Sequence, residues 1–208
     1  MAEWNYGDAY LRFPVEMDKP IDCGNGSTLM AHDIMDNLPK FMLRADIIFT
    51  DSPWNLGNMK SFYTKAGRET PSMDFFAFYT RLFQLIGDVK PRECYLEIGK
   101  EYLDEYIRNM RRIYKYVTFY NSSYYHKPTN FCYIVQGTNK RINRHWDNID
   151  EEDIIDEIGK LDYDVLGDFC MGRGLVACAA KRNGKSFVGT ELNPKRLAVC
   201  LERLSKIE

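Results

Sequence analysis

Hydrophobic and polar positions along the chain follow two alternating periods. Short apolar runs predict buried strands, and longer runs with apolar residues three or four positions apart predict amphipathic helices. The predicted strands cover 46–51, 93–99, 114–122, 130–137, 163–168 and 185–192. The predicted helices cover 27–40, 71–90, 100–113, 151–160, 174–183 and 194–206. The pattern is weakest over 138–160, where we expect a loop or a boundary.

This alternation of strands and helices predicts an α/β fold with a single, mostly parallel sheet and helices on both faces. The 208 residues, 45% of them hydrophobic, suit one domain over 1–208. The chain offers no secretion signal and no apolar run long enough to span a membrane, so we expect a cytoplasmic protein. Six scattered cysteines without C-x-x-C spacing argue against a structural metal site or a disulfide framework.

Charge is distributed unevenly, although the net charge is only −2. The stretch 108–144 holds eight basic residues, eight aromatic residues and no acid, whereas 147–164 holds nine acids and one lysine. Basic side chains bind phosphates and flat rings stack on unpaired bases, so the basic stretch predicts nucleic-acid binding. The candidate contacts are Arg111, Arg112, Lys127, Lys140, Arg141 and Arg144. The alternative is a solvated basic helix followed by aromatic strands that only pack.

The stretch "DFCMGRGLVACAAKRNGKSFVGTELNP" has the layout of a nucleoside-binding site. A predicted strand ends at Asp168, Gly172 and Gly174 open the next helix, and the following strand ends at Glu191. Glycines let the backbone approach a ligand closely, and an acid at the second strand end can accept hydrogen bonds from ribose hydroxyls. The third glycine of the dinucleotide fingerprint and the G-K-[ST] of a P-loop are both missing, so phosphate binding is not indicated.

A second motif, "TDSPWN", ends the predicted strand 46–51. The Asp51 carboxylate and the Ser52 carbonyl, fixed by Pro53, can both accept hydrogen bonds from one exocyclic amine, which turns the nitrogen lone pair outward. The Trp54 ring can stack on the base that carries the amine. The alternative is a buried strand that ends in a proline turn with a core tryptophan.

Both motifs resemble those of one enzyme family. "TDSPWN" resembles the D-P-P-Y/W motif of DNA amino-methyltransferases, and the C-terminal stretch is similar to their S-adenosylmethionine motif, D-P-F-x-G-S-G-T. The catalytic motif comes first, as in the circularly permuted beta class, and the chain is most like its adenine N6 type. The resemblance implies a Rossmann-like fold, S-adenosylmethionine as cofactor, DNA as partner and methylation of a flipped-out base.

By this resemblance, Asp51, Ser52, Pro53 and Trp54 would bind the target amine and base. The cofactor would be held by Asp168, Phe169, Gly172, Gly174, Glu191 and Leu192. Two departures stand out: Ser52 replaces the first proline of the catalytic motif, and "NRHWDNIDEED" stands where the family has H-P-T-Q-K-P. Methyl transfer by this chemistry needs no metal, and we expect none.

Three functions remain open on the sequence. The first is a DNA adenine N6 methyltransferase, and the second a cytosine N4 or RNA methyltransferase. The third is an inactive methyltransferase-fold subunit that binds nucleic acid for a catalytic partner. The short chain leaves little length for a recognition domain, so sequence specificity would be low or would come from a homodimer or a separate specificity subunit.

Overall fold

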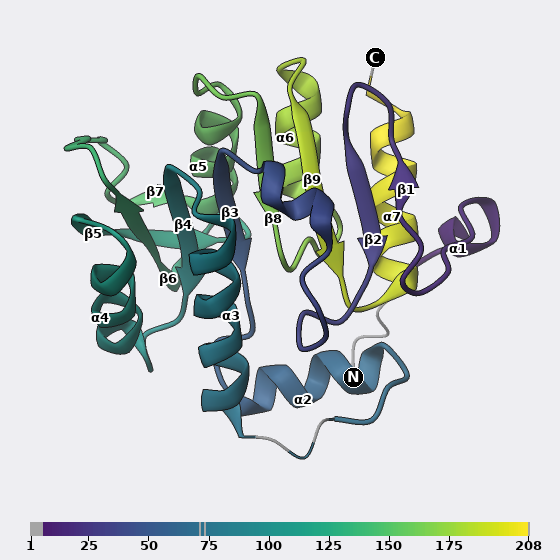
Figure 1. Cartoon of the computed structure of the whole chain (residues 1–208), viewed down its shortest axis with the longest axis horizontal. Coiled ribbons are helices and arrows are strands. Elements are labelled where there is room, and N and C mark those ends of the chain that lie inside the picture. Colours follow the sequence, from purple (N-terminus) through teal and green to yellow (C-terminus); the bar gives the residue numbers. More distant parts are fainter. Residues whose placement is uncertain (1–5, 71, 73, 208) are drawn as a thin grey trace.

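The computed structural model describes residues 6–70, 72 and 74–207. They form a nine-stranded sheet with the order β1-β2-β9-β8-β3-β4-β6-β5-β7 (Figure 1). The strands are β1 (Ile21–Asp22), β2 (Thr28–Ala31), β3 (Ile47–Asp51), β4 (Glu93–Ile98), β5 (Tyr116–Tyr124), β6 (Lys127–Thr138), β7 (Ile149–Asp150), β8 (Val165–Asp168) and β9 (Ser186–Glu191).

The middle of this sheet is parallel, as the sequence predicted. Strands β2, β9, β8, β3 and β4 run in one direction, while β6 pairs antiparallel with both β4 and β5. β1 pairs antiparallel with β2, and β7 pairs parallel with β5. The carboxyl ends of five neighbouring strands therefore meet at one edge, where open α/β sheets bind their ligands.

Helices cover both faces of the sheet (Figure 1). The helices are α1 (Ala9–Arg12), the 3₁₀ helix η1 (Lys40–Arg44), α2 (Leu56–Lys65), α3 (Phe75–Val89), α4 (Leu103–Ile113), α5 (Glu151–Gly159), α6 (Leu175–Arg182) and α7 (Pro194–Ser205). α5, α6 and α7 pack on one face, and α3, α4 and η1 on the other. α2 runs across the bottom of Figure 1, below the carboxyl ends of the parallel strands.

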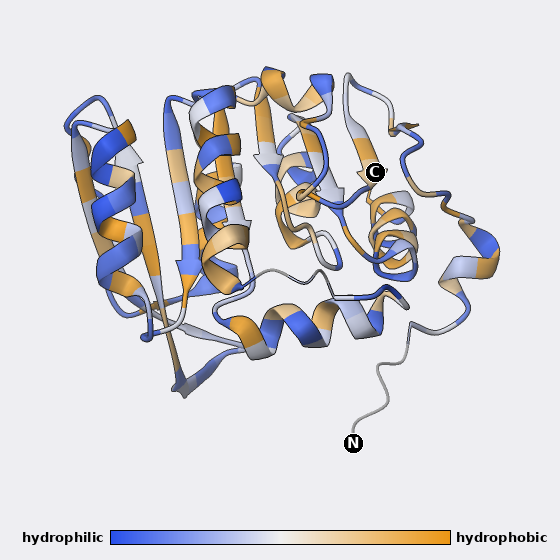
Figure 2. Ribbon diagram, turned by 60° about the horizontal axis from the view of Figure 1, so that its bottom comes forward, coloured by the Kyte–Doolittle hydropathy of each residue, from blue (hydrophilic) through white to orange (hydrophobic). Residues whose placement is uncertain are grey.

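Each face of the sheet has its own hydrophobic core because successive side chains of a strand point to opposite faces. Ile47 and Phe49 belong to the core under α5–α7, and Ile48 belongs to the core under α3 and α4. Burial on both sides explains the apolar runs in the central strands, which are visible as orange segments in Figure 2. Most predicted strands and helices are confirmed within a few residues.

The helix predicted over 27–40 is wrong. Thr28–Ala31 form strand β2, which lies between β1 and β9, and an irregular stretch leads from there to η1. Leu29 and Ala31 are completely buried, and Met30 is nearly so. A strand with three apolar residues in a row shows no period of its own, so pairing with β9 and burial on both faces decided its conformation.

Two further features differ from the sequence prediction. The chain turns between β5 and β6 at Tyr125 and His126, and Lys127, in the gap between the predicted strands 114–122 and 130–137, already belongs to β6. Helix α2 was not predicted at all. Among the described residues, no helix is long and apolar enough to cross a membrane.

Candidate functional site

The two sequence motifs meet at the point where the sheet changes its winding direction. The chain passes from β8 to β9 on one side and from β3 to β4 on the other, so β8 and β3 flank the switch point. These two strands are direct neighbours, with Ile47 opposite Leu166. Asp51 ends β3, Asp168 ends β8 and Glu191 ends the next strand, β9. Motifs more than a hundred residues apart thus share one edge of the sheet.

A cavity of about 600 Å³ opens at this edge. All four residues of the predicted catalytic motif and all but one of the predicted cofactor residues line it. They are Asp51, Ser52, Pro53, Trp54, Asp168, Phe169, Gly172, Glu191 and Leu192. The exception, Gly174, starts α6 just behind the wall. The structure brings the residues of both motifs together, and their individual roles stay predictions.

Thr50 joins the two motifs physically, a contact that sequence reasoning missed. Its hydroxyl donates to Asp168 Oδ1 at 3.2 Å and accepts from the Phe169 N–H at 3.1 Å. Asp168 also accepts from the Cys170 N–H at 2.9 Å. Burial still raises the pKa of Asp168 well above its ordinary value, because these bonds offset only part of the desolvation. The catalytic strand and the cofactor loop therefore share one buried network.

The glycine loop after β8 wraps around the carboxylate of Glu191. Gly172 N–H donates to Glu191 Oε2 at 2.6 Å, and Asn193 N–H donates to Oε1 at 2.9 Å. Gly172 and Gly174 both have positive φ, at 56° and 79°. A Cβ on Gly174 would lie 2.2 Å from Cys200 Sγ, so close packing of α6 on α7 requires glycine there. The loop is thus held in one shape by backbone geometry.

Trp54 is fixed beside Asp51 on three sides. Its Nε1 donates to Asp51 Oδ1 at 3.0 Å, and its ring meets the Tyr124 ring edge-on at 5.4 Å. A Cβ on Gly99 would lie 2.7 Å from Trp54 Cε3, so the ring packs directly on the backbone at the end of β4. The hydrogen bond occupies one Asp51 oxygen and leaves the other for a ligand.

Ser52 occupies the place of the family's first proline, and the structure shows what holds it. Its hydroxyl is hydrogen-bonded to the Tyr106 hydroxyl of α4 at 3.2 Å, and both residues are buried. This bond directs the side chain toward the α3–α4 core. The tyrosine contact thus holds the Ser52 side chain, whereas a proline at this position would fix the backbone φ.

The target end of the cavity is acidic. Enclosure by the cavity walls raises the pKa of Asp51 to about 7, with a further contribution from the negative charge of Glu151. The Trp54 hydrogen bond and the Arg196 charge act in the opposite direction. Burial also raises the pKa of Glu97 and of Glu151, which line the same cavity. Asp51 therefore changes its charge near neutral pH.

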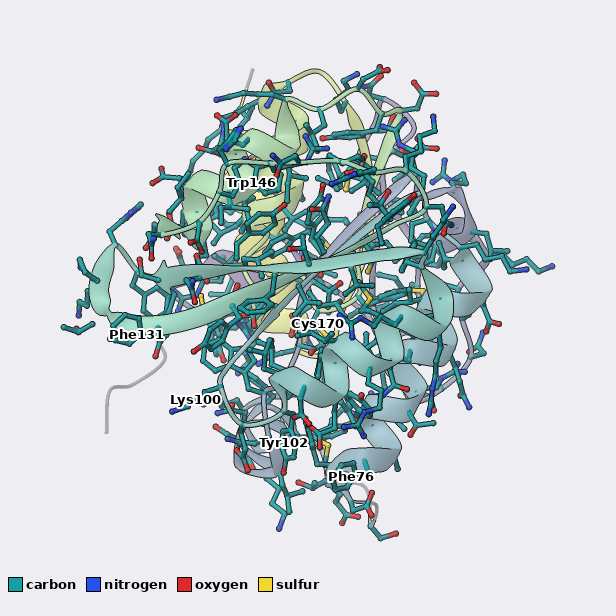
Figure 3. The ribbon with its side chains drawn as sticks, turned by 90° about the vertical axis from the view of Figure 1, so that its left-hand side faces the viewer. Phe76, Lys100, Tyr102, Phe131, Trp146 and Cys170 are labelled. Atoms are coloured by element: carbon teal, nitrogen blue, oxygen red, sulfur yellow. The ribbon has the colours of Figure 1, made fainter. Side chains whose placement is uncertain are left out.

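The tip of the β5–β6 hairpin forms an aromatic wall that sequence reasoning did not assign to the site. Tyr124 and Tyr125 line the cavity, and their rings meet edge-on at 5.1 Å. Tyr125 is 61% exposed, and both Tyr125 and His126 have positive φ, which is rare for such residues. Asp150, the N-cap of α5, holds this turn by accepting from the His126 N–H at 3.0 Å. Phe131 on β6 is 71% exposed and lies toward the outer end of the hairpin in Figure 3.

Helix α2, which was not predicted from the sequence, forms another wall of the cavity. Asn58, Met59, Phe62 and Tyr63 line the cavity from this helix. Asn55 caps its start by accepting from the Asn58 N–H at 2.9 Å. The signal was present in the sequence, since a capping asparagine precedes apolar residues at helical spacing.

The six basic candidates do not form one patch. Lys127 lies at the hairpin tip, paired with Tyr124 beside the cavity. The others lie toward the amino end of β4, where Thr138 pairs with Glu93; that end is about 17 Å of strand away from the cavity. They are Arg111, Arg112, Lys140, Arg141 and Arg144. Arg144 is engaged inside the protein, because it donates to Glu93 Oε2 at 2.9 Å and stacks on Trp146.

No protein-family model matches the sequence, and no curated protein sequence matches it either. Solved structures do match over most of the chain. M1.HpyAVI is similar with a TM-score of 0.57 and 15% identity, covering 85% of this chain and 98% of its own. TTHA0409 of Thermus thermophilus, described as a candidate DNA modification methylase, has a TM-score of 0.60 and 14% identity, with 86% and 94% covered.

The cytosine-N4-specific PvuII DNA methyltransferase is also similar, with a TM-score of 0.55 and 8% identity over 87% of this chain and 90% of its own. The chain has the fold of DNA methyltransferases. Both M1.HpyAVI and TTHA0409 have been solved in complex with S-adenosylmethionine. The predicted α/β methyltransferase fold is thereby confirmed, whereas adenine and cytosine enzymes remain equally compatible with it.

Proposed function

We propose that this chain is an S-adenosylmethionine-dependent DNA methyltransferase that methylates the N6 amine of adenine in a flipped-out base. The observation that carries the proposal is the single cavity that joins the acid and tryptophan of "TDSPWN" to the glycine loop and Glu191. The methyltransferase fold supports it. Asp51 as the first residue of the motif favours adenine over cytosine.

The residues at the β8 and β9 ends fit S-adenosylmethionine. The cavity volume lies in the usual range for a ligand of this size. Each Glu191 oxygen accepts one backbone N–H and keeps a lone pair for a ribose hydroxyl. Gly172 and Phe169 would wrap the amino-acid end, and Leu192 would lie against the adenine. When bound, the cofactor supplies a methyl group activated by its sulfonium.

The residues at the β3 end would hold the target base. The free Asp51 oxygen and the Ser52 carbonyl would accept both amine hydrogens, which points the nitrogen lone pair away from them. Trp54 would stack on the base, and Tyr125, whose ring is exposed at the cavity mouth, would cover it from the hairpin side. The protein then contributes mainly positioning, because the neutral thioether that leaves the sulfonium needs no proton from an acid.

The test is incubation with radiolabelled S-adenosylmethionine and unmethylated genomic DNA, followed by nucleoside digestion and chromatography. We expect label in N6-methyladenine with the wild type and none with Asp51→Ala. Label in N4-methylcytosine would mean that the target base is cytosine and not adenine. Label only in RNA would mean that the substrate is RNA and not DNA. Cofactor binding without transfer to DNA or RNA would favour a subunit that needs a partner.

Gly99→Ala should lower methyl transfer about tenfold or more without changing cofactor affinity. The new methyl group would lie 2.7 Å from Trp54 Cε3, so the ring must move and its hydrogen bond to Asp51 must lengthen. Steady-state rates and calorimetric cofactor affinity would measure both effects. Gly87→Ala on α3 is the control, because its methyl group meets no atom within 4 Å. An equal loss in both variants would contradict this account of Trp54.

Lys127→Ala should weaken DNA binding more than Arg141→Ala does. Both side chains are exposed, but only Lys127 lies beside the cavity. Removing one phosphate contact lowers the slope of log affinity against log salt by about 1. Fluorescence anisotropy across a salt series would measure this slope for each variant and for the double variant. If the double variant binds like the wild type at every salt concentration, the basic residues are not part of the DNA interface.

A further inference from the structure

Two carboxyl groups line the target end of the cavity and have no part in the clamp described above. Glu97 lies on β4 directly opposite Asp51 of β3 in the parallel register, so both side chains are on the same face of the sheet. Glu151 is the first residue of α5. Both are buried, with 2% and 6% exposure, and both line the cavity. Their position in the cavity, and not only their acidity, makes them candidates for contact with the base.

Glu97 and Glu151 approach each other inside the cavity. One oxygen from each and the Sγ of Cys132 all lie within 4.8 Å of one another. Burial and the neighbouring negative charges raise the pKa of both groups, which favours a proton on the pair. A protonated carboxyl group differs from Asp51 in one respect that matters for recognition: it can donate a hydrogen bond.

The surrounding charges favour retention of this proton. Glu97 faces Asp51 from β3, Glu151 from α5 and the Cys132 thiol from β6. Asp150 and Glu152 add negative charge around Glu151. Arg196 of α7 acts on Asp51 with its positive charge, and the His126 ring lies 3.3 Å from Asp150 Oδ1 and 3.6 Å from Glu152 Oε2. Acids therefore dominate the surroundings, and burial raises the pKa of Glu97 well above its ordinary value.

We propose that the Glu97–Glu151 pair reads the target base by donating a hydrogen bond to the ring nitrogen next to its amine. This inference rests on the proposed function. Adenine and cytosine both present an acceptor nitrogen beside a donor amine, and the matching surface is a donor beside an acceptor. Asp51 is the acceptor, and its neighbour in the register, Glu97, carries or shares the donor. Guanine and thymine present an N–H at this position, which would face the carboxyl proton and lose the bond.

The test is the pH dependence of methyl transfer to unmethylated DNA by the wild type, Glu97→Gln and Glu97→Ala. The wild-type rate should fall on the alkaline side, where the pair loses its proton. Glutamine is a permanent donor, so Glu97→Gln should stay within about fivefold of the wild type and lose this alkaline decline. Glu97→Ala should fall about 100-fold at every pH, since the base loses its partner. Melting temperatures would verify that all variants are folded.

Glu93→Gln is the matched control, because Glu93 is a buried carboxyl of the same strand that pairs with Arg144 outside the cavity. It should keep the wild-type pH profile. An alkaline decline that persists in Glu97→Gln, or full activity of Glu97→Ala, would overturn the assignment. So would activity that requires a divalent cation and is lost with EDTA, because the pair and Cys132 would then be metal ligands. A wild type that methylates no nucleic acid refutes the proposed function instead, and the assignment falls with it.

Discussion

Asp51→Asn should lower the rate of methyl transfer by at least about 100-fold while cofactor affinity stays within about twofold of the wild type. The amide keeps the size of the carboxyl but loses its charge, and its NH₂ group would face the amine of the base. Trp54 and Gly99 would hold the new side chain in nearly the same place. Single-turnover rates and calorimetry would separate the two effects. Asp88→Asn, an exposed change on α3, is the control.

The pH profile gives a second result from the same variant. The pKa of Asp51 is about 7, so the wild-type rate should rise with pH as this group ionises and becomes a full acceptor. In Asp51→Asn the residual rate should show no such rise. Together with the alkaline decline expected from Glu97 and Glu151, the wild type should have a bell-shaped profile. A wild-type rate that is flat between pH 6 and 8 would contradict the role of Asp51 in the rate.

Stability should change in the opposite direction to activity. The folded pKa of Asp51 is raised above its ordinary value of about 3.9, so ionisation costs stability as the pH rises toward and through 7. Asp51→Asn should therefore be more stable at pH 8, by on the order of 1 kcal/mol after allowing for water in the cavity. The gain should shrink toward pH 4. Thermal unfolding at several pH values would measure it, and a less stable variant at pH 8 would contradict the raised pKa.

Gly174→Ala should destabilise the fold by about 2–4 kcal/mol and abolish cofactor binding. The residue has φ of 79°, and the added Cβ would lie 2.2 Å from Cys200 Sγ and 2.9 Å from Cys200 Cβ. α6 would have to move away from α7, and the loop that wraps Glu191 would move with it. Chemical denaturation would measure the loss of stability, and calorimetry the loss of affinity.

Two variants divide this effect into its causes. Gly184→Ala has a similar φ of 66° but meets no atom within 4 Å, so it should cost only about 1 kcal/mol from backbone strain. Adding Cys200→Ala to Gly174→Ala removes the sulfur and should recover part of the lost stability. If Gly184→Ala costs as much as Gly174→Ala, the close packing of α6 on α7 is not the cause.

The sequence predicted the elements whose pattern is long or whose ends carry clear signals. Helix α3 has a capping Asp74 and a continuous apolar stripe, and β3 is a β-branched run that ends in a proline turn. Strand β2 could not be predicted because its three apolar residues fit a helix equally well. Its conformation depends on β9, which lies almost 160 residues later in the chain.

The site residues that belong to sequence motifs could be predicted. The site residues whose role comes from their neighbours in three dimensions could not. Asp51 and Glu191 stand at strand ends in recognisable patterns, so their meeting at one edge followed from an α/β fold. Thr50, Gly99 and Glu97 carry no local signal. Their importance comes from the residues that the fold brings against them: Asp168, Trp54 and Asp51.

The strand order also affects how the chain can fold during synthesis. β2 and β3 leave the ribosome long before their partners β9 and β8, with Leu29 pairing with Gly189 and Ile47 with Leu166. Until then both strands expose apolar faces and unpaired edges, the features that lead to aggregation. Closing such distant pairs also slows folding. We expect the nascent chain to depend on chaperones until β8 and β9 have emerged, because the strand order separates these pairs so widely along the chain.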